Sequence, residues 1–224
     1  MKNFLILQHE DITPPGSTLA WLEKNHFSYE IIPTSTVINY PDLNKDQHII
    51  ICGGTQNVDQ EIQYPWLKKE KKFIASAIKN KNKILGLCLG AQLIAEVMGA
   101  KVFKAMQWEF GWQKIHFDSC NNHLFEKSRY VFQAHGYQFS LPDGTSRIAH
   151  SEACPNQGFL NNHTLAFQFH PEVDQAWIDL CLEGEEITGN FCQNFNDIRL
   201  ETPQKIQSNI SWYFSILDFF FLNK

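Results

Sequence analysis

The stretch Ile84-Leu-Gly-Leu-Cys-Leu-Gly-Ala-Gln-Leu-Ile94 joins an apolar run to an amphipathic one, and Cys88 lies at the junction between two glycines. The apolar run predicts a buried strand over 83–88, and the residues after it predict a helix over 89–98. A strand that turns into a helix within one or two residues makes a sharp elbow, which needs small residues on both sides because the chain folds close against itself. The elbow would hold the Cys88 sulfur at the carboxyl edge of the sheet, where open α/β sheets bind their ligands.

Strand-like and helix-like segments alternate along the chain before this elbow. We predict strands over 4–9, 29–33 and 48–54, and helices over 17–26 and 66–80. This alternation, with strands that are apolar almost throughout, predicts an α/β fold with a mostly parallel or mixed central sheet and helices on both faces. After Ala100 the pattern changes to short strands at 101–103, 112–117, 130–134, 147–150 and 165–169. Because no linker, repeat or boundary interrupts the chain, we predict a single domain over residues 1–224.

Composition excludes several classes of protein. The net charge of −5 and the lack of a basic patch argue against binding to nucleic acid or to an anionic membrane. The apolar run at 4–7 is too short for a secretory signal. The apolar run at 212–222 is shorter than the ~20 residues of a membrane span, and Asp218 interrupts it, so we predict a packed terminal helix. These features predict a cytoplasmic protein.

The cysteines and histidines do not have the spacing of a metal site. The six cysteines form no CxxC pair, and the nine histidines form no HxxxH or HExxH pattern. We therefore predict no metal and no cofactor. Cys52 and Cys154 are interpreted as buried packing thiols, since cysteine serves readily as a small hydrophobic residue.

Two further residues complete a catalytic pattern around Cys88. A helix N-terminus beneath the sulfur favours the thiolate, and the amide of Leu89 is placed to donate to a developing oxyanion. A thiolate that forms an acyl-enzyme needs a base, and that base needs an orienting partner. In Phe169-His-Pro-Glu172, a predicted strand ends at His170, and Glu172 follows two residues later on the same side.

Together these motifs resemble the class I, or triad, glutamine amidotransferase family, in particular stand-alone members related to the glutaminase domain of GMP synthase. The resemblance covers about residues 3–175 and leaves a C-terminal helical extension at about 176–224. Further segments that resemble family blocks are Gly53-Gly54, Tyr64-Pro-Trp-Leu67, Glu109-Phe-Gly-Trp112, Phe132-Gln-Ala-His-Gly136 and Ser151-Glu-Ala-Cys-Pro-Asn156. The fold that it implies is the flavodoxin-like amidotransferase fold.

The resemblance implies a role for each motif residue. The implied catalytic residues are the nucleophile Cys88, the general acid and base His170, and the orienting carboxylate Glu172. The implied oxyanion-hole donors are the amides of Gly54 and Leu89, and the implied substrate-binding positions are Gln92 and the backbone of Gly136 and Tyr137. The chain departs from the family at two places. Relatives usually have Pro after the glycine pair, where this chain has Thr55-Gln56, and they commonly have Trp-His-Gly-Asp, where this chain has Ala134-His-Gly-Tyr137.

Three functions are open at this point. The first is an amidotransferase that hydrolyses glutamine and passes ammonia to a separate synthase, because the chain contains no ATP-binding motif of its own. The second is a free-standing hydrolase of γ-glutamyl compounds. The third is a binding or regulatory protein that keeps the glutamine pocket without turnover.

Overall fold

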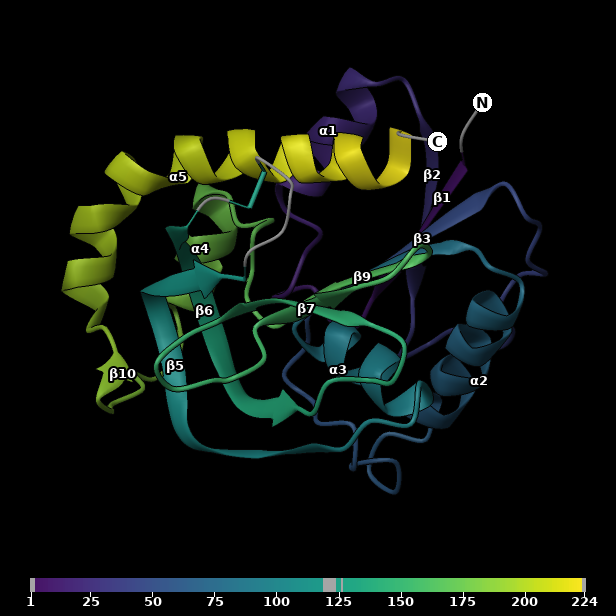
Figure 1. The fold of residues 1–224 in the computed structure, drawn as a ribbon, viewed down its shortest axis with the longest axis horizontal. Coiled ribbons are helices and arrows are strands. Elements are labelled where there is room, and N and C mark those ends of the chain that lie inside the picture. Colours follow the sequence, from purple (N-terminus) through teal and green to yellow (C-terminus); the bar gives the residue numbers. More distant parts are fainter. Residues whose placement is uncertain (1–2, 119–123, 126, 223–224) are drawn as a thin grey trace.

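A mixed β-sheet forms the centre of the molecule in the computed structural model, which describes residues 3–118, 124–125 and 127–222 (Figure 1). The described strands follow the spatial order β10-β5-β7-β8-β9-β4-β3-β1-β2, and β6 pairs with β5. Their bounds are β1 Asn3–Gln8, β2 Ser28–Pro33, β3 Gln47–Ile51, β4 Lys83–Leu87, β5 Val102–Phe117, β6 Ser128–Phe139, β7 Ser146–His150, β8 Gly158–Leu160, β9 Thr164–Phe167 and β10 Phe191–Cys192. The predicted single α/β domain is confirmed.

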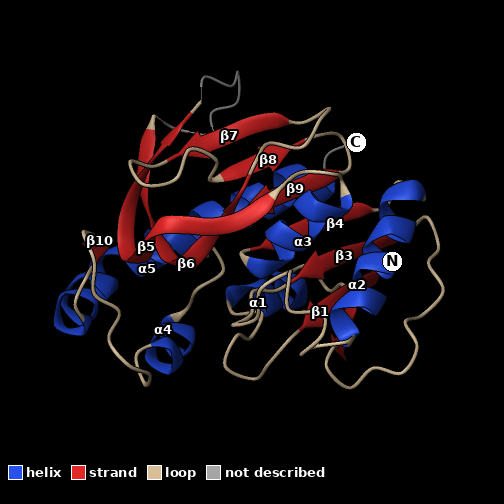
Figure 2. Cartoon of the chain, turned by 90° about the horizontal axis from the view of Figure 1, so that it is seen from below, coloured by secondary structure: helices blue, strands red, loops and turns tan. Residues whose placement is uncertain are grey.

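The half of the sheet that carries β2, β1, β3, β4 and β9 is parallel, and helices cover both of its faces. Successive side chains of a strand point to opposite faces, so Phe4 and Ile6 join one core while Leu5 and Leu7 join the other. The first core is closed by α1 (Ser17–Lys24) and α5 (Phe195–Leu217), and the second by α2 (Trp66–Lys79) and α3 (Leu89–Val97). In Figure 1, α1 and α5 lie above the strands and α2 and α3 lie below them; Figure 2 views the same elements from below, coloured by secondary structure.

The antiparallel half differs from the short strands that the sequence predicts. The predicted pieces at 101–103 and 112–117 are parts of one long strand, β5, which pairs with β6 and has an irregular register between Lys104 and Glu109. The sequence did not predict the connecting residues as strand because they lack a burial pattern, with Met106 and Trp108 exposed. Pairing with β6 on both sides of this irregularity makes the two predicted pieces one strand.

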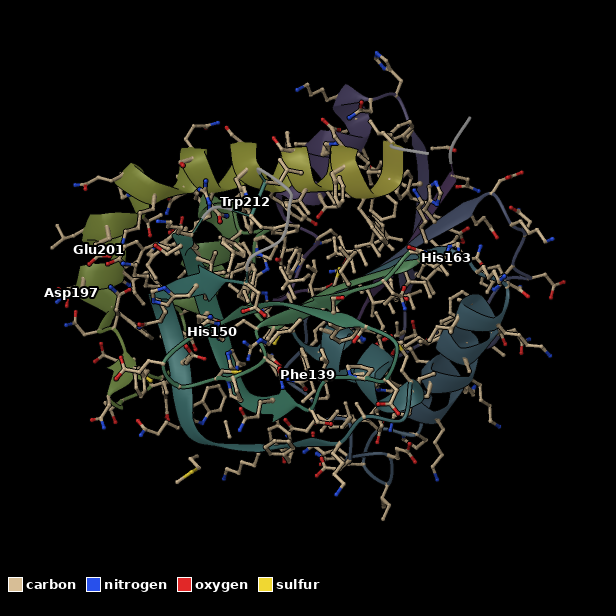
Figure 3. The ribbon with its side chains drawn as sticks, viewed as in Figure 1. Phe139, His150, His163, Asp197, Glu201 and Trp212 are labelled. Carbon is tan, nitrogen blue, oxygen red and sulfur yellow. The ribbon has the colours of Figure 1, made fainter. Side chains whose placement is uncertain are left out.

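The C-terminal part packs against the first elements of the chain. The helix predicted from residue 212 begins earlier, at Phe195, and ends in a π-helical turn at Asp218–Leu222. It changes direction along its length, as expected for a helix with an internal proline, Pro203 (Figure 1). Trp212 points from α5 into the molecule (Figure 3), where it contacts Phe117 and Phe169. No helix among the described residues has the length and apolarity needed to cross a bilayer.

Candidate active site

The tight elbow predicted at Cys88 is present at the junction of β4 and α3. Cys88 has φ 50° and ψ −106°, a conformation that non-glycine residues rarely adopt, and it directly precedes the first turn of α3. A β-carbon on Gly86 would lie 2.8 Å from the backbone nitrogen of Ala91, and one on Gly90 would lie 2.3 Å from the carbonyl oxygen of Ile51 in β3. The two glycines therefore let α3 fold back onto its own strand and onto the neighbouring one.

Gly90→Ala is expected to lower the free energy of unfolding by about 1–3 kcal/mol, because the added methyl group meets backbone that cannot move without disturbing the sheet. Urea denaturation of the purified variant measures this loss. Gly184→Ala is the matched control, since a β-carbon there has no atom within 4 Å. Equal stability of the two variants would contradict the close packing of α3 on β3.

His170 and Glu172 meet beside the elbow on the segment that follows β9. His170 Nδ1 lies 2.7 Å from Glu172 Oε1, and both side chains are buried. Three hydrogen bonds hold this segment: His170 N donates to Phe132 O, Ser17 N donates to Glu172 O, and Asn209 Nδ2 donates to Pro171 O, each at 2.8 Å. The strand ends at Phe167 rather than Phe169, but the predicted closeness of the imidazole and the carboxylate is present.

The electrostatics of the site favour a charged imidazole. Burial alone would lower the pKa of His170, but the negative charges of Glu172 and of a Cys88 thiolate, with a hydrogen bond to each, outweigh it and raise the pKa to about 10. Burial raises the pKa of Cys52 well above its usual range and raises that of Cys154 to about 12, so both thiols stay protonated at neutral pH. Cys120 lies outside the described residues.

A cavity of about 490 Å³ opens over the Cys88 thiol and brings the predicted site residues together. Of these, the lining includes Gly54, Leu89, Gln92, Gly136 and Tyr137, in addition to Cys88 and His170. Glu172 lies behind His170 and does not line the cavity. The Cys88 elbow and His170 thus face one shared space, and Glu172 contacts His170 from outside it.

Three residues near the thiol were not predicted from the sequence as part of the site: Gln168, Trp177 and Trp108. Gln168 Nε2 lies 3.7 Å from Cys88 Sγ, and Gln168 Oε1 accepts a 3.3 Å hydrogen bond from Gln92 Nε2. The alternation of residues before His170 could have identified Gln168. The ring of Trp177, in α4 (Gln175–Cys181), lies 4.7 Å from the ring of His170, and the indole of Trp108 lies so close to Gly136 that a β-carbon there would be 2.4 Å away. These contacts join distant segments.

A second buried group, beside the cavity, consists of Glu109, His135 and Cys154, whose potential ligand atoms lie within 4.8 Å of one another. Its members already have partners: His135 Nε2 lies 3.2 Å from Glu109 Oε2, which also accepts a 2.7 Å hydrogen bond from Gln157 Nε2. The Cys154 thiol donates to the carbonyl oxygen of Asn156. We interpret the group as a polar link between β5, β6 and the segment after β7.

The fold and the site define an α/β protein with a cysteine at a strand-to-helix elbow, and comparison with known proteins identifies its family. The model of the family "Glutamine amidotransferase class-I" matches residues 17–179. The chain is 32% identical over 173 residues to one subunit of the glutamine-hydrolyzing GMP synthase from Methanocaldococcus jannaschii, which covers 74% of this chain and 84% of the relative. The corresponding subunit from Thermoplasma acidophilum is 31% identical over 183 residues, covering 78% and 86%. The chain belongs to the class I glutamine amidotransferase family.

Solved structures have the same fold, and their similarity extends into the C-terminal part of this chain. A glutamine amidotransferase from Thermotoga maritima superposes with a TM-score of 0.88 at 25% identity and covers 99% of this chain and 98% of its own. A glutamine amidotransferase from Methylobacillus flagellatus has the same TM-score of 0.88 at 22% identity, covers 96% and 92%, and shows the fold alone. The architecture beyond residue 179, outside the family match, is therefore shared with the first of these structures.

Proposed function

We propose that this protein hydrolyses the side-chain amide of glutamine through a thioester on Cys88, with release of ammonia and glutamate. The observation that supports this most directly is the buried His170–Glu172 pair facing a thiol on an elbow. The imidazole makes a 2.7 Å contact with the carboxylate and lines the same cavity as the thiol. Such a chain of groups supplies a nucleophile, a proton carrier and an orienting charge.

In the proposed reaction, the Cys88 thiolate attacks the amide carbon and a carbon–sulfur bond forms. The amides of Gly54 and Leu89 stabilise the oxyanion, because both residues line the cavity next to the thiol. The carbon–nitrogen bond then breaks, and the leaving ammonia takes a proton from the His170 imidazolium. Neutral His170 next removes a proton from water, which attacks the thioester, and glutamate leaves as the thiolate reforms.

Recognition of the substrate is assigned to Gln92, Gly136 and Tyr137, which line the same cavity as Cys88. Gln92 offers an amide that Gln168 orients, and the backbone at Gly136 and Tyr137 offers main-chain groups for the α-carboxylate. The Tyr137 side chain stands where relatives commonly have an aspartate, and burial and the charge of Asp59 raise the pKa of its phenol. We therefore assign glutamine binding here to main-chain groups and to Gln92.

The acceptor of the ammonia is proposed to be a separate synthase subunit. The relatives from Methanocaldococcus jannaschii and Thermoplasma acidophilum support this, since their names describe one subunit of a glutamine-hydrolyzing GMP synthase. The 224 residues themselves contain no ATP-binding motif.

A free-standing γ-glutamyl hydrolase is the second candidate, and the wall of the cavity favours it. Trp108, Leu180 and Ile187 line the cavity together with Cys88 and add an apolar surface, part of it from beyond the family match. An amine larger than ammonia could occupy that surface when the γ-glutamyl group is on Cys88.

Turnover by the isolated chain distinguishes the two candidates. An amidotransferase subunit is expected to hydrolyse glutamine slowly when alone, below about 1 per second, with equal amounts of ammonia and glutamate. The measurement is kcat for glutamine and for a panel of γ-glutamyl peptides, with Cys88→Ser as the inactive control. Fast peptide cleavage with negligible glutamine turnover would favour the hydrolase, and binding of glutamine without any turnover would favour a regulatory protein.

A further inference from the structure

A buried ion pair lies behind the glycine loop and outside the chemistry described so far. His9 follows β1, and Glu70 lies on α2; the side chains of both are fully buried. His9 Nδ1 lies 2.7 Å from the carbonyl oxygen of Gly53, and His9 Nε2 lies 3.0 Å from Glu70 Oε1. The Gly53 carbonyl can only accept, so Nδ1 must carry a hydrogen; beside an ionised Glu70, Nε2 carries one too, and the pair is then an imidazolium and a carboxylate.

The surroundings stabilise this charge. Burial by itself would lower the pKa of His9, but Glu70, the Gly53 carbonyl and the charge of Glu10 raise it above the ordinary value. Burial and the charge of Glu70 raise the pKa of Tyr40, and burial with the charges of Glu172 and Glu70 raises the pKa of Cys52, so both groups are neutral near pH 7. Trp66 stacks on the His9 ring at 5.4 Å between centroids.

The pair fixes the orientation of one peptide group. The Gly53 carbonyl accepts a hydrogen bond from His9 and another, at 3.1 Å, from Thr13 Oγ1. In the following peptide, the amide of Thr55 donates to Glu10 Oε1 at 2.6 Å. The carbonyl and amide of a trans peptide point to opposite sides, so a carbonyl held by His9 turns the Gly54 amide away from His9. Gly54 lines the cavity over Cys88 and His9 does not.

We propose that His9 and Glu70 are positioning residues that hold the Gly53–Gly54 peptide with its amide turned toward the carbonyl group bound at Cys88. The proposal rests on the proposed function, in which the Gly54 amide is an oxyanion donor. A charged donor on the carbonyl also polarises the peptide and strengthens its N–H as a donor. Two adjacent glycines by themselves allow the peptide between them to flip. Here His9, after β1, and Glu70, on α2, hold that peptide in one orientation.

The test compares two double variants that leave no buried charge unpaired. In His9→Leu with Glu70→Leu, the hydrogen bond to Gly53 is lost, and we expect kcat for amide hydrolysis to fall by about 10- to 100-fold with KM unchanged. In His9→Asn with Glu70→Gln, the asparagine amide can donate to Gly53 in place of Nδ1, and part of kcat should return. Alkylation of Cys88 by iodoacetamide, which displaces iodide and forms no oxyanion, should keep its wild-type rate in both.

Each other outcome has a defined meaning. Wild-type kcat in the Leu/Leu variant would overturn the positioning role, and so would an equal loss of turnover and alkylation. In either case, turnover by the unmodified protein would still support the proposed function. An unmodified protein that turns over no γ-glutamyl compound would overturn both. If the Leu/Leu variant does not fold, nitrogen-15 NMR of the unmodified protein decides: a hydrogen on His9 Nδ1 at about pH 8 supports the positioning role, and a ring without a hydrogen on Nδ1 overturns it.

Discussion

Cys88→Ser is expected to abolish both turnover and covalent labelling by a glutamine-mimicking electrophile such as a diazoketone. The serine hydroxyl fits the elbow but is not ionised by a helix N-terminus, so kcat should fall by at least about 10⁴-fold. Mass spectrometry of the unmodified protein should find one label, on the peptide that contains Cys88.

Cys181→Ser is the matched control, because Cys181 lines the same cavity while burial raises the pKa of its thiol to about 12. This variant should label as the unmodified protein does. Labelling that persists in Cys88→Ser, or that falls mainly on Cys52, would remove Cys88 as the nucleophile.

Glu172→Gln is expected to keep the fold and to lower kcat by about 10²- to 10⁴-fold, because a neutral amide cannot stabilise the His170 imidazolium. His170→Ala should lose more, since it removes the proton carrier itself. Steady-state kinetics of the two variants gives the order, and a wild-type rate in Glu172→Gln would show that another carboxylate orients the histidine.

The same substitution should change how stability depends on pH. The folded pKa of His170, about 10, lies above the ordinary value of 6.5, so the pair stabilises the fold fully below about pH 6.5 and loses this contribution as pH rises through about 10. Glu172→Gln removes the largest opposing charge and should flatten the fall in the free energy of unfolding over this window. If the free energy of unfolding falls with pH as steeply in Glu172→Gln as in the unmodified protein, other groups cause the fall. His9, whose pKa is also raised, would be the first of these to test.

Local patterns were sufficient to predict the parallel half of the fold and the elbow. Apolar strands, glycine shoulders and a His-Pro-Glu segment each carry their information within a few neighbouring residues. The expectation that Cys88 and His170 lie together came from the family resemblance. In the structure it results from the parallel pairing of β9 with β4, which brings the ends of both strands to one edge.

Pairings between distant segments were not predictable in this way. His9 and Glu70 lie far apart in the sequence, and neither stands in a motif, so only the packing of α2 beside the end of β1 brings them together. The outer part of β5 lacks an apolar face, and its strand character comes from pairing with β6. The wall supplied by Leu180 and Ile187 likewise depends on how the C-terminal part folds over the cavity.

The packing of α5 against the first strand has a consequence for biosynthesis. Phe4 and Trp21 share a core with Tyr213 and Phe221, so this face of the sheet stays uncovered on the ribosome until the last of these residues has been made. Contacts between such distant parts of a chain slow folding, and exposed apolar surface favours aggregation in the meantime. The nascent protein should therefore depend on chaperones more than its size suggests, and truncation within α5 should give insoluble protein even though every proposed catalytic residue lies earlier in the chain.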